Sequence, residues 1–130
     1  MATSINNSGV LFPDATTQTT AGAILSTAQT FTAPQRGTVT ADNDLSFDLS
    51  VTNNFSCTPT GTGTLTFTNH TAGQSGFILL TNSSGYAISA AATTKINATD
   101  LSAISASGTY VLSYFDNGTN TYVMVSRSFA

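Results

Sequence analysis

Apolar and polar residues alternate strictly in two segments, 45–51 and 62–68. In the first segment serine and aspartate separate the apolar residues Leu45, Phe47, Leu49 and Val51. In the second, threonines separate Gly63, Leu65 and Phe67. A period of two sends successive side chains to opposite faces of a sheet. Each segment therefore predicts a half-buried strand with one face toward solvent.

A short apolar run without alternation follows at 77–80, with the sequence FILL. Such a run is typical of a strand that is covered on both faces. Residues 86–89 are expected to be its partner strand, because the intervening TNSSG of 81–85 is rich in turn-forming residues.

The strongest hairpin pattern lies near the C-terminus, where the β-rich segments 110–115 and 122–129 flank the sequence DNGTNT. Asn117 and Gly118 in this loop tolerate the positive φ angles of a tight turn. One face is expected to carry Leu112, Tyr114, Tyr122 and Met124. The other is expected to carry Val111, Phe115, Val123, Val125 and Phe129. With two apolar faces, the hairpin either lies between two layers of one subunit or packs one face against another subunit.

Residues 1–34 differ from the rest, because they show no sustained period of 2 or 3.6. A weak helical pattern at 21–28 is long enough for only one or two turns, and strand patterns begin near Gly37. We therefore predict two parts, an extended N-terminal attachment arm (1–34) and a β-sandwich domain (35–130). The expected fold is all-β: an antiparallel, jelly-roll-like sandwich, with no parallel sheet because strands do not alternate with helices.

Composition narrows the possible functions. Only 7% of the residues are charged, and the chain has three basic residues and six acidic ones, with a net charge of −3. Nucleic-acid binding and a basic membrane-surface helix are not expected, because both need clustered lysine and arginine. No apolar run is long enough to span a membrane, and no secretory signal pattern is present. The single cysteine, Cys57, cannot form an internal disulfide, which favours a reducing cytosol as the place of synthesis.

The residues that could perform catalysis are few. His70, the only histidine, lies in a turn context, and Cys57 is most simply a small buried apolar residue. A Cys57–His70 dyad would lack a third group to orient the histidine. Asp42, Asp44 and Asp48 are expected to cap turns, because the glycine and glutamate of a calcium loop do not follow them. We therefore expect no enzyme activity, no cofactor and no metal site.

The segment FPDATTQTTAG (12–22) resembles a short motif, roughly FPDGTTQTTA, of bacteriophage tail-fibre and other virion proteins, with Ala15 where glycine is usual. Residues 35–130 resemble a β-domain at the C-terminal ends of phage structural proteins. This resemblance rests on QRG at 35–37, AGQSG at 72–76, the hairpin with YFDNGTNTYV and the terminal SFA. The segment AISAAATTKINATDLSAISAS replaces the aromatic-rich strand that is usual before the last hairpin.

The resemblance implies a virion component that assembles in the cytoplasm of a bacterial host. One possibility is a capsid decoration (cement) protein, a homotrimer that binds and stabilises the head shell through contacts with the major capsid protein or another virion protein. The other is a tail-fibre or receptor-binding module for a bacterial glycan, for which Tyr86, Tyr110, Tyr114 and Tyr122 are the candidate stacking residues. The expected partner-binding residues of the arm are Val10, Leu11, Phe12 and Pro13.

Overall fold

The computed structural model describes residues 4–6, 9–11, 17–18, 28 and 30–129 of the chain. The chain divides into two compact units, Met1–Gln35 and Arg36–Ala130. We call the second unit the body. The described residues of both units are predominantly β-structure, with one short helix in the body. The expectation of an all-β protein is therefore confirmed at this level.

The N-terminal unit contains three short strands in its described residues: β1 (Ser4–Asn6), β2 (Gly9–Leu11) and β3 (Thr17–Gln18). Strand β2 lies between the other two and pairs with both in antiparallel register. The sequence predicts an extended arm here, whereas these residues form local strand pairs. The weak helical pattern at 21–28 falls outside the described residues except for Ala28.

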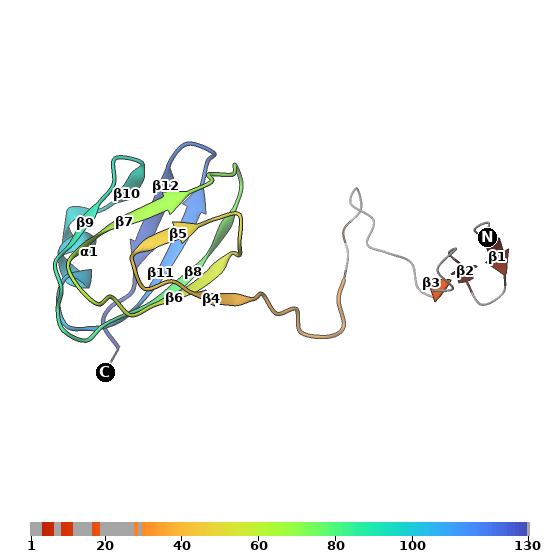
Figure 1. Ribbon diagram of the computed structural model, residues 1–130, viewed down its shortest axis with the longest axis horizontal. Coiled ribbons are helices and arrows are strands. Elements are labelled where there is room, and N and C mark those ends of the chain that lie inside the picture. The colour runs from red at the N-terminus through yellow and green to blue at the C-terminus, as the bar shows by residue number, and fades with distance from the viewer. Residues whose placement is uncertain (1–3, 7–8, 12–16, 19–27, 29, 130) are drawn as a thin grey trace. The chain divides into compact units, whose positions relative to one another are not determined.

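The body contains two sheets that face each other across a common core (Figure 1). The larger sheet has the order β10-β12-β11-β8-β6-β4 and the smaller one the order β5-β7-β9. The strands of the larger sheet are β4 (Val39–Ala41), β6 (Asn54–Cys57), β8 (Ser75–Asn82), β10 (Thr94–Ile96), β11 (Gly108–Asp116) and β12 (Thr121–Val125). Those of the smaller sheet are β5 (Ser46–Asp48), β7 (Gly63–Thr68) and β9 (Ile88–Ala90).

From β4 to β9 the chain alternates between the two sheets, one strand at a time. Successive strands of each sheet therefore run in the same direction, and three two-strand coils stack as in a solenoid. Within the described body, five strand pairs are parallel and two are antiparallel. The prediction of an antiparallel, jelly-roll-like sandwich is wrong in this respect. From β4 to β9, a strand in the opposite sheet connects each pair of parallel neighbours, so the parallel pairing needs no connecting helix.

The same crossing changes the partner of segment 86–89. The sequence predicts a hairpin with 77–80, but β9 pairs in parallel with β7 and not with β8. The chain turns from one sheet to the other between Asn82 and Tyr86, where Gly85 has a φ of 67°. The Asn82 side chain donates to Tyr86 O and accepts from Tyr86 N, both at 2.9 Å, and so fixes this corner.

The core lies between the sheets and is built from the inward positions of the alternating strands. Its buried members from the smaller sheet and the residues flanking β5 are Leu45, Phe47, Leu49, Leu65, Phe67 and Ile88. The larger sheet contributes Phe55, Cys57, Ile78, Leu80, Tyr110, Leu112, Tyr114 and Val123. Aromatic rings join the two layers, since Phe47 contacts Phe55 with ring centroids 5.1 Å apart. The alternation at 45–49 and 63–67 is confirmed, but Val51 is exposed because β5 ends before it.

The short helix α1 (Ala98–Ile104) follows β10 and packs against β9 and β12 at one end of the body (Figure 1). The Asn97 side chain caps its first turn by accepting from Thr99 N at 2.8 Å. Ile104 is its buried residue and joins the core. None of the helices among the described residues has the length and apolar character needed to cross a membrane.

The C-terminal hairpin of β11 and β12 is confirmed, with Gly118 in its loop at a φ of 89°. The prediction of its two faces is wrong for β12. Phe115 pairs with Tyr122 and Tyr114 pairs with Val123. Tyr122 therefore shares a face with Phe115, because the four residues of loop 117–120 fix a register that differs by one from the expected one.

Candidate functional site

The outward side of the larger sheet is apolar at its centre. We call this side the outer face; its large apolar members are Val39, Phe77, Leu79, Val111, Phe115, Tyr122 and Met124. Exposure reaches 58% for Phe77 and 72% for Met124. The described residues of the body leave these side chains uncovered. The sequence predicts that 77–80 is covered on both faces, and within the body this is wrong for Phe77 and Leu79.

The strand register places these side chains side by side. Phe77 of β8 lies opposite Ser113 of β11, which lies opposite Met124 of β12. Two residues further along β11, Phe115 lies opposite Tyr122. Neighbouring side chains on one face of an antiparallel pair are about 5 Å apart. The large apolar groups of β8, β11 and β12 therefore form one patch, and Asn54 and Ser56 of β6 separate Val39 from it.

Charge is nearly absent from the outer face. Lys95 of β10 is the one charged residue among the described outward positions of the six strands, and it lies at the margin opposite Tyr122. The remaining outward positions carry Asn, Ser, Thr and Ala side chains. Such a surface neither selects a charged partner nor repels an identical copy of itself.

A groove of about 480 Å³ borders the patch at the start of β8. Its lining residues are Gly37, Asn53, Asn54, Ser75, Gly76, Phe77, Ser113 and Tyr114. A Cβ atom at Gly76 would overlap the carbonyl oxygen of Asn53, which shows why glycine is needed there. Tyr114 donates its hydroxyl to the same oxygen at 2.9 Å, and Phe77 N donates to it as well. The floor of the groove is therefore closely packed.

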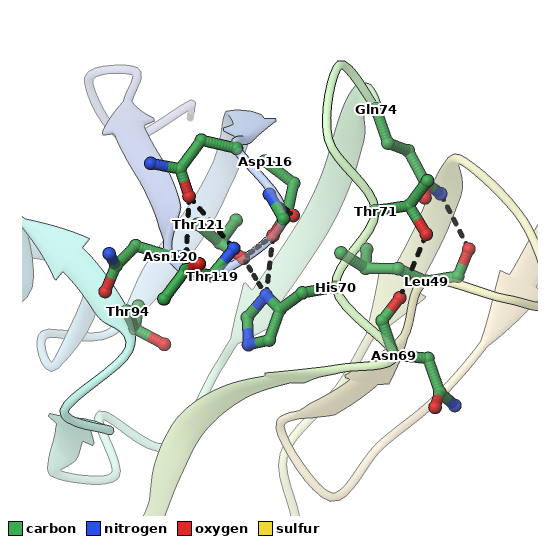
Figure 2. Close-up of polar contacts among 12 residues, drawn as sticks. Leu49, Asn69, His70, Thr71, Gln74, Thr94, Asp116, Thr119, Asn120 and Thr121 are labelled. Carbon is green, nitrogen blue, oxygen red and sulfur yellow. Dashed lines mark hydrogen bonds and ion pairs between the residues drawn. The ribbon is translucent and has the colours of Figure 1, made fainter.

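A second feature is a hydrogen-bonded cluster around the buried side chain of Asp116 (Figure 2). His70 extends from the loop after β7 and places its Nδ1 2.7 Å from Asp116 Oδ2. Thr121 Oγ1 donates to the same oxygen at 2.6 Å, and Gly118 N donates to Asp116 Oδ1 at 2.8 Å. The sequence predicts His70 as a surface turn residue, but its side chain is only 19% exposed and is paired with a carboxylate.

Three donors decide the charge state of Asp116. Burial alone would raise the pKa of this carboxyl group, but the hydrogen bonds from His70, Thr121 and the Gly118 amide outweigh it, and the pKa lies below its ordinary value. The backbone of Asp116 also bonds with the loop that carries His70, because Gly73 N donates to Asp116 O and Asp116 N donates to Gln74 O. The cluster thus joins loop 69–74 to the hairpin loop. Thr121 is fully buried, so its hydroxyl is not accessible from solvent.

The lowered pKa of Asp116 predicts how stability depends on pH. The ionised side chain stabilises the folded state above the unfolded pKa of about 3.9, and this contribution is lost as pH falls through the lower folded pKa. We expect Asp116→Asn to reduce the free energy of unfolding at pH 7 by about 1–3 kcal/mol. The variant should also lose less stability than the wild type between pH 4 and pH 2. Urea unfolding at several pH values measures this, and parallel curves for both proteins would contradict it.

The other candidate residues from the sequence have structural positions. Cys57 is buried in the core, and burial raises the pKa of its thiol to about 11, with a smaller contribution from nearby aspartates. Asp44 and Asp48 cap turns, as expected, by accepting from Ser46 N and Ser50 N. The described residues contain no group of three or more His, Cys, Asp or Glu side chains that could hold a metal ion.

The structure does not bring Cys57 and His70 together, because His70 bonds with Asp116 instead. Of the tyrosines considered for sugar stacking, Tyr110 and Tyr114 are buried, and Tyr122 lies on the outer face. Among the partner-binding residues expected in the arm, Val10 and Leu11 lie in β2. Phe12 and Pro13 lie outside the described residues.

The sequence shows few signs of either feature. The apolar residues on both faces of the hairpin indicate that one face packs against another layer or subunit. The sequence, however, assigns the residues of β12 to the opposite faces from those in the structure. The Asp116–His70 pair joins residues 46 positions apart, and no local pattern connects them. Comparisons of this chain with protein-family models, with curated proteins and with solved structures found no match.

Proposed function

We propose that the protein is a non-enzymatic structural component of a bacteriophage virion, most simply a capsid decoration (cement) protein. In this proposal it assembles in the host cytoplasm, associates as a homotrimer, and binds the head shell through the major capsid protein or another virion protein. The observation that carries the proposal is the outer face, a largely apolar surface with one marginal charge that the described body does not cover. The resemblance of residues 12–22 and 35–130 to phage structural proteins supports it.

The size of the outer face suits a protein–protein contact. A half-exposed aromatic or methionine side chain contributes on the order of 100 Å² of accessible surface. Together the exposed members offer several hundred Å², which approaches the roughly 800 Å² that each partner buries in a typical stable interface. Isolated apolar residues are common on protein surfaces, but a continuous patch of this kind marks a binding surface. We assign it to contacts between copies within the trimer.

The N-terminal unit is the proposed attachment segment. It holds the threonine-rich sequence of the resemblance, in which Asp14 is the one charged residue. Its first large apolar residues after Ile5 are Val10, Leu11 and Phe12, followed by Pro13. Strand β2, which contains Val10 and Leu11, is already paired on both sides within its own small sheet. In this proposal these side chains, rather than free backbone groups of β2, contact the shell.

Deleting residues 1–34 is expected to leave a folded body that no longer binds the shell. The body has its own core, and among the residues that the structure describes the buried cluster begins at Leu45. Loss of several large apolar anchors should weaken binding by several kcal/mol, which is about a thousandfold. Co-sedimentation of the truncated chain with head shells measures binding, and circular dichroism measures folding.

The full chain carrying Thr17→Ala provides a matched control that keeps the arm. A truncated chain that sediments with shells as the full chain does would contradict the attachment role of the arm. A truncated chain that fails to fold would show that residues 1–34 support the core. Light scattering of the full chain that gives a stable monomer at micromolar concentration would contradict the trimer.

The second candidate function is glycan recognition, and the groove beside Gly76 favours it. Its uncharged amide and hydroxyl groups next to the exposed ring of Phe77 are the kinds of group that bind a neutral sugar. A volume of about 480 Å³ is in the range of small-ligand sites. Binding of the full chain to host polysaccharide, lost in Phe77→Ala while shell binding persists, would favour this function over decoration.

A further inference from the structure

A strand at the edge of a sheet offers unpaired backbone groups. At three of the four sheet edges in the body, local contacts occupy some of these groups. At β5, Asp44 Oδ1 accepts from Ser46 N at 2.8 Å and Val51 N donates to Asp48 O at 3.2 Å. At β9, the Ser105 hydroxyl accepts from Ile88 N at 3.0 Å and donates to Ile88 O.

At β10, Thr94 N donates to Ala91 O at 2.9 Å. The fourth edge, on β4, differs. Asp42 N donates to Ser56 O of the neighbouring β6. Backbone groups alternate in direction along a strand, so those of Thr40 also face β6 while those of Val39 and Ala41 point outward. Within the described residues, the outward groups of Val39 and Ala41 have no hydrogen-bond partner.

We propose that β4 pairs in antiparallel register with β4 of a second copy, about a twofold axis that passes beside Thr40. In this register Val39 faces Ala41 of the second copy, and the reverse pair is equivalent. Each of these two pairs exchanges both of its N–H and C=O groups, as the hydrogen-bonded pairs of an antiparallel ladder do. The edge of β4 is therefore complementary to the same edge of a second copy turned by 180°, as a twofold contact requires.

Charge supports a second copy as the partner. Extending the register by one position beyond Ala41 places Thr38 opposite Asp42, so that Arg36 of each copy lies near Asp42 of the other. Arg36 is exposed and makes no ion pair among the described residues. Burial raises the pKa of Asp42, and the hydrogen bond with Asp44 and the charge of Asp44 raise it further. A nearby arginine would relieve this repulsion.

The contact goes beyond the proposed function, because it uses backbone groups of the β4 edge rather than the apolar side chains of β8, β11 and β12 or a shell protein. A twofold edge contact joins two copies, so that in a decorated shell it would link one trimer to its neighbour. It also joins two larger sheets edge to edge.

A cysteine at the twofold axis tests the register in the full chain. Across a non-hydrogen-bonded antiparallel pair the two Cα atoms are about 4.5 Å apart, which allows a disulfide. We therefore expect Thr40→Cys to form a disulfide-linked dimer under mild oxidation. Thr38→Cys is the matched control, because four residues of stagger separate its two copies by about 13 Å. We expect it to crosslink at least tenfold more slowly. Cys57, which is buried, does not compete.

Charge reversal tests the partner contacts. Arg36→Asp in the Thr40→Cys chain should slow crosslinking several-fold, and adding Asp42→Arg should restore it, because the ion pair is then reversed. The same crosslink should form in a chain that also carries Phe77→Ser and Phe115→Ser, which separates this contact from the outer face. Equal crosslinking of the Thr40→Cys and Thr38→Cys chains would overturn the proposal, as would a rate that is unchanged by Arg36→Asp.

Discussion

Replacing Phe77 and Phe115 together with serine is expected to dissociate the proposed trimer into monomers. Both rings are at least half exposed in the body, at 58% and 50%, and they lie in the apolar part of the outer face. Burying an aromatic ring of this exposure in an interface contributes roughly 1–2 kcal/mol. The two losses in each contact should raise the dissociation constant by about 30-fold to 1,000-fold. Sedimentation equilibrium over a range of concentrations measures the change.

The matched control for this variant is Phe31→Ser with Val51→Ser. Both residues are as exposed as Phe77, at 60%, but lie outside the strands of the larger sheet. We expect this chain to associate as the wild type does, and both variants to unfold at the wild-type denaturant concentration when all are monomeric. An unchanged dissociation constant for the Phe77 and Phe115 double variant would remove the outer face from the proposed trimer.

Asn82→Ala is expected to have the largest effect on the stability of the body. Asn82 is fully buried, and its amide donates to Tyr86 O and to Ile104 O, each at 2.9 Å. Its Oδ1 atom accepts from Tyr86 N. Alanine would leave two carbonyl groups and one N–H without this partner at a site where water has little access. Each unsatisfied buried group costs about 1–3 kcal/mol, so the free energy of unfolding should fall by at least 3 kcal/mol.

Asn43→Ala is the control for this prediction. Asn43 makes one side-chain hydrogen bond, in which Thr58 N donates to its Oδ1 at 2.8 Å, and the contact is exposed. Its removal should cost no more than about 1 kcal/mol. Urea unfolding of both variants at equal protein concentration gives the comparison. A loss for Asn82→Ala that does not exceed the loss for Asn43→Ala would show that the corner at 82–86 is held by other contacts.

Local patterns in the sequence predict several strands of the body correctly. The alternation around Phe47 and around Phe67 identifies the inward side chains of β5 and β7, and the Asn117-Gly118 pair identifies the hairpin loop. Each of these features depends on residues that lie a few positions apart in the chain, so a local sequence pattern is enough to predict it. The helix at 98–104 is not predicted, although the capping residue Asn97 and the first-turn Asp100 are present in the sequence.

The choice of strand partners could not be predicted in this way. Alternation shows which side chains of β9 are inward, but it does not show that the chain has crossed to the smaller sheet before Ile88. Which side chains of β12 face the core depends on whether the loop between the paired residues Asp116 and Thr121 has an odd or an even number of residues. The pairing of His70 with Asp116 depends on two loops meeting in space. Each of these is a consequence of tertiary structure.

The position of β11 and β12 in the larger sheet has a consequence for synthesis on the ribosome. Strand β8 pairs with β11, so this pair forms only after residues 108–116 have been synthesised. Strand β10 pairs with β12, so this pair forms only after residues 121–125 have been synthesised. Until β11 has emerged, a nascent chain can stack the coils from β4 to β9 but leaves one side of β8 as an open edge. Folding of the larger sheet should therefore finish after most of the chain has been translated, and chaperones that bind open β-edges have this interval in which to act.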